Sequence, residues 1–213
     1  MDAVRTRIAG HVTPRPWMLL GEADVIRDLL LNLRPKRCLE WGAGASSLYF
    51  AKFLSADARW LAIEHDQSWA AHLFKLVRRP IVEITHVAPN CLKRDGDCGA
   101  GSYCAFSDYI EYPERSAKYD FILVDGMARN ECLIKAQTLL APGGVIVLHD
   151  ANCPEFHAGT ASYTYQFMLT GRGTNQNGIW VGSMDIPIED VLNVRAHHRI
   201  WMFYLRLRRL LRR

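Results

Sequence analysis

Short apolar runs alternate with longer segments of mixed polarity through the first two thirds of the chain. The apolar runs have the length of buried strands, and they cover residues 36–41, 59–64, 81–87, 120–125 and 145–148. The segments before and between them repeat apolar residues every three or four positions, as helices that pack on a sheet do. These segments cover residues 22–33, 48–54, 67–77 and 130–140. Because strands this uniformly apolar are covered on both faces, the pattern predicts a doubly wound, mostly parallel α/β sheet.

The pattern is interrupted at two places. Residues 88–118 contain glycines, cysteines and little periodicity, so we expect a long loop with a short helix near Tyr109. After Asp150, residues 161–169 are expected to form a helix, and residues 178–183 a late strand in a hairpin at the sheet edge. The expected organisation is a lead-in and helix at 1–35, one main domain at 36–193 and a basic amphipathic helix at 194–213.

Composition places the chain among single-domain globular proteins. It has 213 residues, of which 49% are hydrophobic, and this is enough for a substantial core. The apolar runs stay well below the ~20 residues of a membrane span, and residues 1–10 lack the apolar stretch of a signal peptide. The expected location is therefore the cytoplasm.

The net charge of +4 is concentrated at the C-terminus. Residues 195–213 contain seven of the 26 lysines and arginines and no acidic residue, which leaves 19 basic against 22 acidic side chains in residues 1–194. The body therefore has no basic surplus for nucleic-acid binding. The basic, apolar segment suits an anionic membrane surface, so peripheral attachment to the inner face of the membrane is a hypothesis. The alternative is that the segment docks on the body or on another subunit.

The six cysteines do not have the spacing of a zinc site. They stand at positions 38, 91, 98, 104, 132 and 153, and no two of them form a Cys-x-x-Cys pair. We expect reduced thiols, as is usual in the cytoplasm. A disulfide among Cys91, Cys98 and Cys104, which share one loop, is left open.

A turn with two glycines follows the first predicted strand. Gly42 and Gly44 lack a Cβ, so the backbone can bend sharply there and approach a ligand closely. Ser46 or Ser47 is a suitable N-cap for the helix that follows. A strand, a glycine turn and a helix N-terminus together form a binding place for a nucleotide-like cofactor.

Polar residues also end four of the predicted strands, at Glu40, at Glu64-His65-Asp66, at Asp125 and at His149-Asp150. Ligands of parallel sheets bind at this edge, where the strand order reverses. Glu64 lies 20 residues after Gly44, an interval that suits a carboxylate accepting hydrogen bonds from both hydroxyls of a ribose.

Two residues distinguish between the cofactors that contain a ribose. NAD favours a third glycine in the turn, and here that place holds Ser47. Glu40 would repel a neighbouring pyrophosphate, whereas it would attract a ligand with a positive ammonium or sulfonium group.

Four motifs occur in order along residues 36–152, namely Glu40-x-Gly42-x-Gly44, then Glu64, then Tyr119-Asp120-x-x-x-Val124-Asp125-Gly126, then Pro142-Gly143-Gly144-Val145. This ordered set resembles the class I S-adenosylmethionine-dependent methyltransferases. The resemblance implies a seven-stranded sheet with an antiparallel C-terminal hairpin, and S-adenosylmethionine as cofactor. It implies that Glu40, Gly42 and Gly44 lie by the methionine part, Glu64 at the ribose and His65 near the adenine. Ser46 and Asp125 complete the expected cofactor site.

Two strand-end motifs narrow the resemblance. Val124-Asp125-Gly126-x-x-Arg129 and Leu148-His149-Asp150-Ala151 are similar to those of bacterial O-methyltransferases of sugars, glycans and natural products. Some relatives hold a divalent cation with an aspartate after the fourth strand and an Asp-Asp or Asp-Asn pair after the fifth. Asp125 and Asp150 match two of these places, and Ala151 does not match the third, although Asn152 is adjacent. Magnesium is therefore left open.

Methyl transfer of this kind requires the enzyme to align the acceptor and remove its proton. His149 is the expected base, because imidazole titrates near neutrality. Asp150 would orient His149, bind the acceptor hydroxyl or hold a metal, and Asp125 would contact the acceptor or the sulfonium. Arg129 would bind an anionic acceptor or lie in solvent.

The expected function is O-methylation of a sugar, a glycan precursor or a small natural product. Two alternatives remain, an NAD-dependent oxidoreductase on the same fold and a non-catalytic module that binds the cofactor or a membrane. The acceptor, the metal and a homo-oligomeric state are left open.

Overall fold

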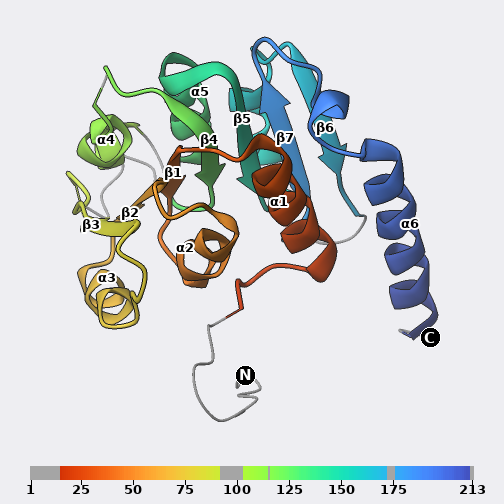
Figure 1. Ribbon diagram of the computed structural model, residues 1–213, viewed down its shortest axis with the longest axis horizontal. Coiled ribbons are helices and arrows are strands. Elements are labelled where there is room, and N and C mark those ends of the chain that lie inside the picture. The colour runs from red at the N-terminus through yellow and green to blue at the C-terminus, as the bar shows by residue number, and fades with distance from the viewer. Residues whose placement is uncertain (1–14, 92–102, 115, 172–175, 212–213) are drawn as a thin grey trace.

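One sheet of seven strands runs through the part of the chain that the computed structural model describes, which is residues 15–91, 103–114, 116–171 and 176–211 (Figure 1). Its strands are β1 (Arg37–Trp41), β2 (Arg59–Glu64), β3 (Val82–His86), β4 (Tyr119–Val124), β5 (Leu140–His149), β6 (Tyr165–Leu169) and β7 (Ile179–Ser183). Their order is β3-β2-β1-β4-β5-β7-β6, in which β1 to β5 pair in parallel and β7 is antiparallel to both neighbours. The predicted doubly wound sheet with an antiparallel C-terminal hairpin is confirmed.

Helices cover both faces of this sheet (Figure 1). They are α1 (Leu20–Leu33), α2 (Ala45–Phe50), α3 (Gln67–Phe74), α4 (Tyr103–Glu111), α5 (Arg129–Leu139) and α6 (Val194–Leu211). The first three and α6 share one hydrophobic core, and α4 and α5 share the other. Successive residues of β1 enter different cores, with Cys38 in the first and Leu39 in the second. This alternation explains why the strands are apolar on both faces.

The segment predicted as a helix at 161–169 contains a strand instead. Residues of β6 pair with β7 from Tyr165 opposite Ser183 to Leu169 opposite Ile179. Phe167 and Leu169 pack on the first core, whereas Gln166 accepts a hydrogen bond from Trp180 of the second core. The side chains thus alternate with period two, and pairing with β7 prevails over the weak helical pattern.

Several boundaries differ from the prediction. β5 begins at Leu140, directly after α5, so Pro142, Gly143 and Gly144 belong to the strand rather than to a connection. α4 contains the expected short helix near Tyr109, and it begins earlier because a second helical stretch joins it across a kink at Phe106. Cys91 and Cys104 are free thiols, and Cys98 lies outside the described residues.

The predicted C-terminal helix is present as α6, at the edge of the molecule (Figure 1). In the described ranges, no helix combines the length and the apolarity that crossing a bilayer would require.

Candidate functional site

The polar residues predicted at the strand ends gather at one edge of the sheet. β1 lies between β2 and β4, so the strand order reverses at β1 and β4. The amide of Asp125 donates to the carbonyl of Trp41 over 2.9 Å, and the amide of Gly42 donates to that of Ile63 over 2.8 Å. These bonds hold the ends of the three strands together where open α/β sheets bind ligands.

Two glycines bring the turn after β1 against the turn after β4. Gly42 has a φ of +97°, and a Cβ at this position would lie 2.4 Å from the backbone nitrogen of Gly126. A Cβ on Gly126 would lie 2.1 Å from the hydroxyl of Tyr109. Because neither position accepts a side chain, the sharp turn predicted at Gly42 is confirmed. Gly44 differs, since its backbone is extended and it serves as N-cap of α2.

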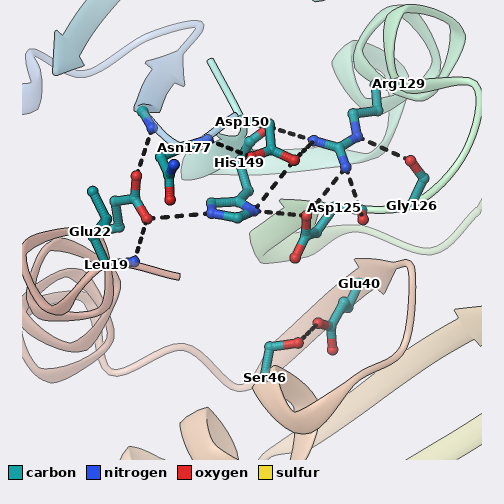
Figure 2. A network of polar contacts seen from close by, with 11 residues as sticks. Leu19, Glu22, Glu40, Ser46, Asp125, Gly126, Arg129, His149, Asp150 and Asn177 are labelled. Carbon is teal, nitrogen blue, oxygen red and sulfur yellow. Dashed lines mark hydrogen bonds and ion pairs between the residues drawn. The ribbon is translucent and has the colours of Figure 1, made fainter. Parts of the chain in front are cut away.

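Glu40 lies beneath this turn, with no exposed surface. Its Oε1 accepts a hydrogen bond of 2.5 Å from the hydroxyl of Ser46 (Figure 2). Its Oε2 accepts bonds from the hydroxyl of Ser47 at 2.5 Å and from Trp60 Nε1 at 2.8 Å. Burial raises the pKa of Glu40 to about 7, although the three hydrogen bonds act to lower it.

These contacts correct one prediction. Gly44 is the N-cap of α2, and Ser46 and Ser47 lie inside its first turn, where both hydroxyls donate to Glu40 and that of Ser47 also accepts from the amide of Gly44 over 3.1 Å. A carboxylate without exposed surface does not touch a ligand in this conformation, so Glu40 holds α2 to β1 from below. Its predicted place by the charged part of a cofactor, and that of Ser46, stay predictions.

Glu64 stands at the end of β2 with one oxygen already engaged. Its Oε1 accepts from the backbone nitrogens of His65 and Asp66 over 2.9 and 2.8 Å, and it lies 2.8 Å from His65 Nδ1. Among the described residues only Oε1 has a partner, so Oε2 is the atom available to ligand hydroxyls. The position therefore fits the predicted ribose role.

His65 forms the start of an aromatic wall beside Glu64. Its ring packs edge-on against Phe106 and Tyr109 of α4, at centroid distances of 5.8 and 6.3 Å. The hydrogen bond with Glu64 raises the pKa of His65, against the opposing effect of burial. The rings meet edge to face, and Phe106 and Tyr109 are buried, so His65 is the partly exposed member beside Glu64. The place of the adenine near His65 stays a prediction.

A chain of five charged side chains of alternating sign runs along the other half of the edge (Figure 2). His149 Nδ1 lies 2.8 Å from Asp125 Oδ1, and His149 Nε2 lies 3.3 Å from Glu22 Oε2. Arg129 continues the chain, with nitrogens 3.3 Å from Asp125 Oδ1 and 3.2 Å from Asp150 Oδ2. We call Glu22, His149, Asp125, Arg129 and Asp150 the charge array.

The environment of His149 is against its predicted role as the base. Burial alone would lower the pKa of His149, but the carboxylates of Asp125 and Glu22 outweigh it and raise the pKa to about 10. The imidazole is therefore protonated near neutral pH, and both ring nitrogens face carboxylates. A protonated imidazolium has no lone pair for a substrate proton, so the predicted role of His149 as base would require it to lose this proton first.

Arg129 lies between the two aspartates of this edge. One atom each from Asp125, His149 and Asp150 come within 4.8 Å of one another, as in a candidate metal cluster. The guanidinium of Arg129 already bridges both aspartates and donates to the carbonyl of His149 over 2.6 Å. A divalent cation would be repelled by this guanidinium and by protonated His149. The residues present therefore do not fit a divalent cation, and Arg129 is an internal cation, not a solvated or acceptor-binding one.

Glu22 is the member of the array that sequence reasoning missed. It lies on α1, fully buried, and its Oε2 accepts from the amide of Leu19 over 2.6 Å while its Oε1 accepts from the amide of Gly178. The sequence feature that could have revealed Glu22 is its position on the same helical face as Val25 and Ile26. A charged residue is rare on a buried face unless it has partners.

A separate groove of about 450 Å³ lies between α4 and α5. It is lined by Tyr103, Ile110, Glu111, Glu131, Ile134, Lys135 and Thr138, and contains none of the predicted site residues. We therefore assign the candidate site to the strand ends.

The strand order, the antiparallel β7 and the glycine turn after β1 define the fold of the class I methyltransferases. An O-methyltransferase from Bacillus cereus in complex with S-adenosylhomocysteine is 17% identical, covers 80% of this chain and 84% of its own, and has a TM-score of 0.57. TomG from Streptomyces achromogenes, an O-methyltransferase involved in tomaymycin synthesis and solved with S-adenosylmethionine, is 23% identical over 78% and 79%, with a TM-score of 0.52.

A methyltransferase-like protein from Silicibacter pomeroyi extends the likeness over 87% of this chain and 97% of its own, at 20% identity and a TM-score of 0.55. No protein-family model matches the chain, and no curated protein matches its sequence. The solved structures therefore establish the fold.

Proposed function

We propose that this protein is an S-adenosylmethionine-dependent O-methyltransferase. The observation that carries the proposal is the placement of the Gly42 turn, Glu64 and Asp125 around the point where the strand order reverses in a methyltransferase fold. S-adenosylmethionine or S-adenosylhomocysteine is bound in two solved structures of the same fold. Ser47, where NAD-binding turns have their third glycine, is fully buried and donates to Glu40, so the turn is built differently from that of an NAD enzyme.

In this proposal, Asp125 is the member of the charge array that meets the acceptor. S-adenosylmethionine supplies a methyl group on a good leaving group, so the protein must orient a hydroxyl and accept its proton. Both oxygens of Asp150 are engaged, by Asn177 and Arg129. In the described residues, contacts to the Asp125 carboxylate are made at Oδ1, and this side chain is 21% exposed. Oδ2 of Asp125 is therefore the atom available to an acceptor hydroxyl.

The acceptor in this proposal is a small molecule with a free hydroxyl, of the sugar, glycan-precursor or natural-product class. TomG, which shares the fold, takes part in making a natural product. Tyr163 and His157 follow β5 but are engaged within the protein, donating to the carbonyl of Leu133 and lying 2.7 Å from that of Ala151.

Calorimetry separates this function from its alternatives. We expect S-adenosylhomocysteine to bind with a Kd in about the micromolar range, and NAD to give no measurable heat. Glu64→Ala should weaken the binding by about 10- to 100-fold, since it removes a charged hydrogen-bond acceptor. Glu83→Ala, an exposed carboxylate on neighbouring β3, should leave it unchanged. Binding of NAD in preference to S-adenosylhomocysteine would refute the proposal.

Turnover should depend on Asp125. With labelled cofactor and a panel of hydroxylated acceptors, we expect Asp125→Asn to lower kcat by about 10²- to 10⁴-fold while the affinity for S-adenosylhomocysteine changes little. An unchanged kcat on the acceptor that the panel identifies would exclude Asp125 as the proton acceptor. Full loss of transfer in the parent chain, with cofactor binding intact, would favour a non-catalytic module.

Chelation should have no effect on activity. Because Arg129 occupies the place between Asp125 and Asp150, we expect EDTA to leave both methyl transfer and S-adenosylhomocysteine affinity unchanged, and added magnesium to restore nothing. Loss of activity on chelation, recovered with Mg²⁺, would show that the guanidinium moves aside for a metal.

A further inference from the structure

α6 carries an apolar surface that its own fold does not use. One face of the helix is docked on the body, where Trp201 is buried and donates to the carbonyl of Thr170 over 2.9 Å. His197 lies 3.1 Å from Asp28 of α1 on the same side. A second face, formed by Ile200, Phe203 and Leu207, is 56%, 68% and 42% exposed. We call these three residues the apolar stripe.

Helical geometry separates the apolar stripe from both the docked face and the charges. Residues three and four apart lie on one side of a helix, so Ile200, Phe203 and Leu207 form a continuous line along α6. At about 100° per residue, the exposed basic side chains Arg199 and Arg206 fall along the edge of this line away from the docked face. The outward half of the helix is thus divided lengthwise into an apolar strip and a basic strip.

The charge of the segment is of one sign. Residues 195–213 contain seven arginines and no acidic residue, and four of the arginines stand at positions 208, 209, 212 and 213. A second copy of the chain that covered the apolar stripe with its own α6 antiparallel would bring Arg199 and Arg206 of both copies to the same edge. A surface that is both anionic and able to receive apolar side chains matches the two strips together.

We propose that α6 binds an anionic lipid surface, with the apolar stripe inserted at the level of the headgroups and the arginines on the lipid phosphates. The helix lies in the plane of the membrane, since no described helix is suited to cross it. Attachment through α6 leaves the strand ends and the proposed cofactor site on the body of the protein. Lipid binding by α6 therefore does not depend on the proposed methyl transfer. A peripheral location on an anionic leaflet is the consequence.

Flotation with the full-length protein tests the proposal. The vesicles are phosphatidylcholine alone and an equimolar mixture of phosphatidylcholine and phosphatidylglycerol. We expect the parent protein to float with the mixed vesicles only, and the bound fraction to fall as salt is raised. The double variant Ile200→Ser/Phe203→Ser and the double variant Arg199→Gln/Arg206→Gln should each reduce the bound fraction by roughly tenfold.

Met202→Ser is the matched control, because Met202 is an exposed apolar residue of α6 that lies away from the apolar stripe. It should float like the parent protein. All four substituted positions of the double variants are exposed, so circular dichroism and the Tm should be unchanged. A parent protein that stays in the bottom fraction with the mixed vesicles, or double variants that float as well as the parent, would overturn the proposal. A dimer that Ile200→Ser/Phe203→Ser dissociates in sedimentation would also overturn it, because a second copy would then cover the stripe.

Discussion

Replacing Gly42 with alanine is expected to abolish tight binding of S-adenosylhomocysteine and to lower the free energy of unfolding by about 2–5 kcal/mol. The residue has a φ of +97°, and the new Cβ would lie within 2.5 Å of two backbone atoms of Gly126. Backbone atoms cannot rotate away as a side chain can, so the turns after β1 and β4 must separate. Separation displaces Asp125 and opens the place where the cofactor is expected.

Gly143→Ala distinguishes this contact from the cost of backbone conformation alone. Gly143 also has a positive φ, of +75°, but a Cβ there would meet no atom within 4 Å. We expect this control to lose only about 1–2 kcal/mol and to keep its affinity for the cofactor product. Urea denaturation gives the stability of each variant, and calorimetry on the folded protein gives the affinity. Equal effects of the two substitutions would mean that the contact with Gly126 is unimportant.

The sheet could be predicted from the sequence because its central strands are buried on both faces. Apolar runs such as 59–64 and 120–125 are recognisable without any knowledge of their neighbours. Polar residues directly after such runs then have to meet at one edge of the sheet. For this reason Glu64 and Asp125 were placed correctly from the sequence, and the glycine turn with them.

Predictions that needed knowledge of a partner from elsewhere in the chain were less successful. β6 lies at the sheet edge, where its side chains are partly exposed and the choice between helix and strand depends on pairing with β7. Glu40 was expected to face the ligand, but Ser46, Ser47 and Trp60 enclose it. The side-chain type was informative at both places, whereas the orientation depended on long-range packing.

His149 shows the same limit for chemistry. An imidazole at a strand end is a reasonable base when it has one acidic neighbour and access to solvent. Here its second neighbour, Glu22, comes from a helix 127 residues earlier in the chain. The buried carboxylate of Glu22 and the partly exposed carboxylate of Asp125 keep the ring protonated, so a group expected to remove a proton instead holds one.

The charge array is expected to make the stability of the protein fall as the pH rises from about 6.5 to about 10. The folded-state pKa of His149, about 10, is above the ordinary histidine pKa of 6.5, which applies when the chain is unfolded. The folded protein therefore binds one more proton in this range, and the contribution of His149 is complete below pH 6.5 and lost as the pH passes through the folded pKa. The pKa of Glu40 is raised to about 7 in the folded protein. Glu40 therefore also makes the stability fall as the pH rises, but only up to about pH 7.

His149→Gln should remove this part of the pH dependence. Because it leaves Glu22 buried without its cation, we expect the free energy of unfolding to fall by about 3–5 kcal/mol at pH 6. The difference between parent and variant should shrink as the pH approaches 10. Denaturation curves at several pH values measure this difference, and Asp57→Asn, which breaks an exposed ion pair with Lys36, is the control with little effect at any pH. A difference that stays constant with pH would show that His149 is neutral in the folded protein.

Glu22→Gln tests whether the array acts as a unit. If Glu22 and His149 stabilise the fold only as a pair, the double variant should be little worse than either single variant, whereas independent contributions would add. Glu22 also accepts from the amide of Gly178, at the start of β7, so a coupled result would show that α1 is fastened to the strand ends through a buried charge. Strong coupling between these residues therefore predicts that substitutions at Glu22 also lower turnover, because Asp125 loses the imidazolium that positions it.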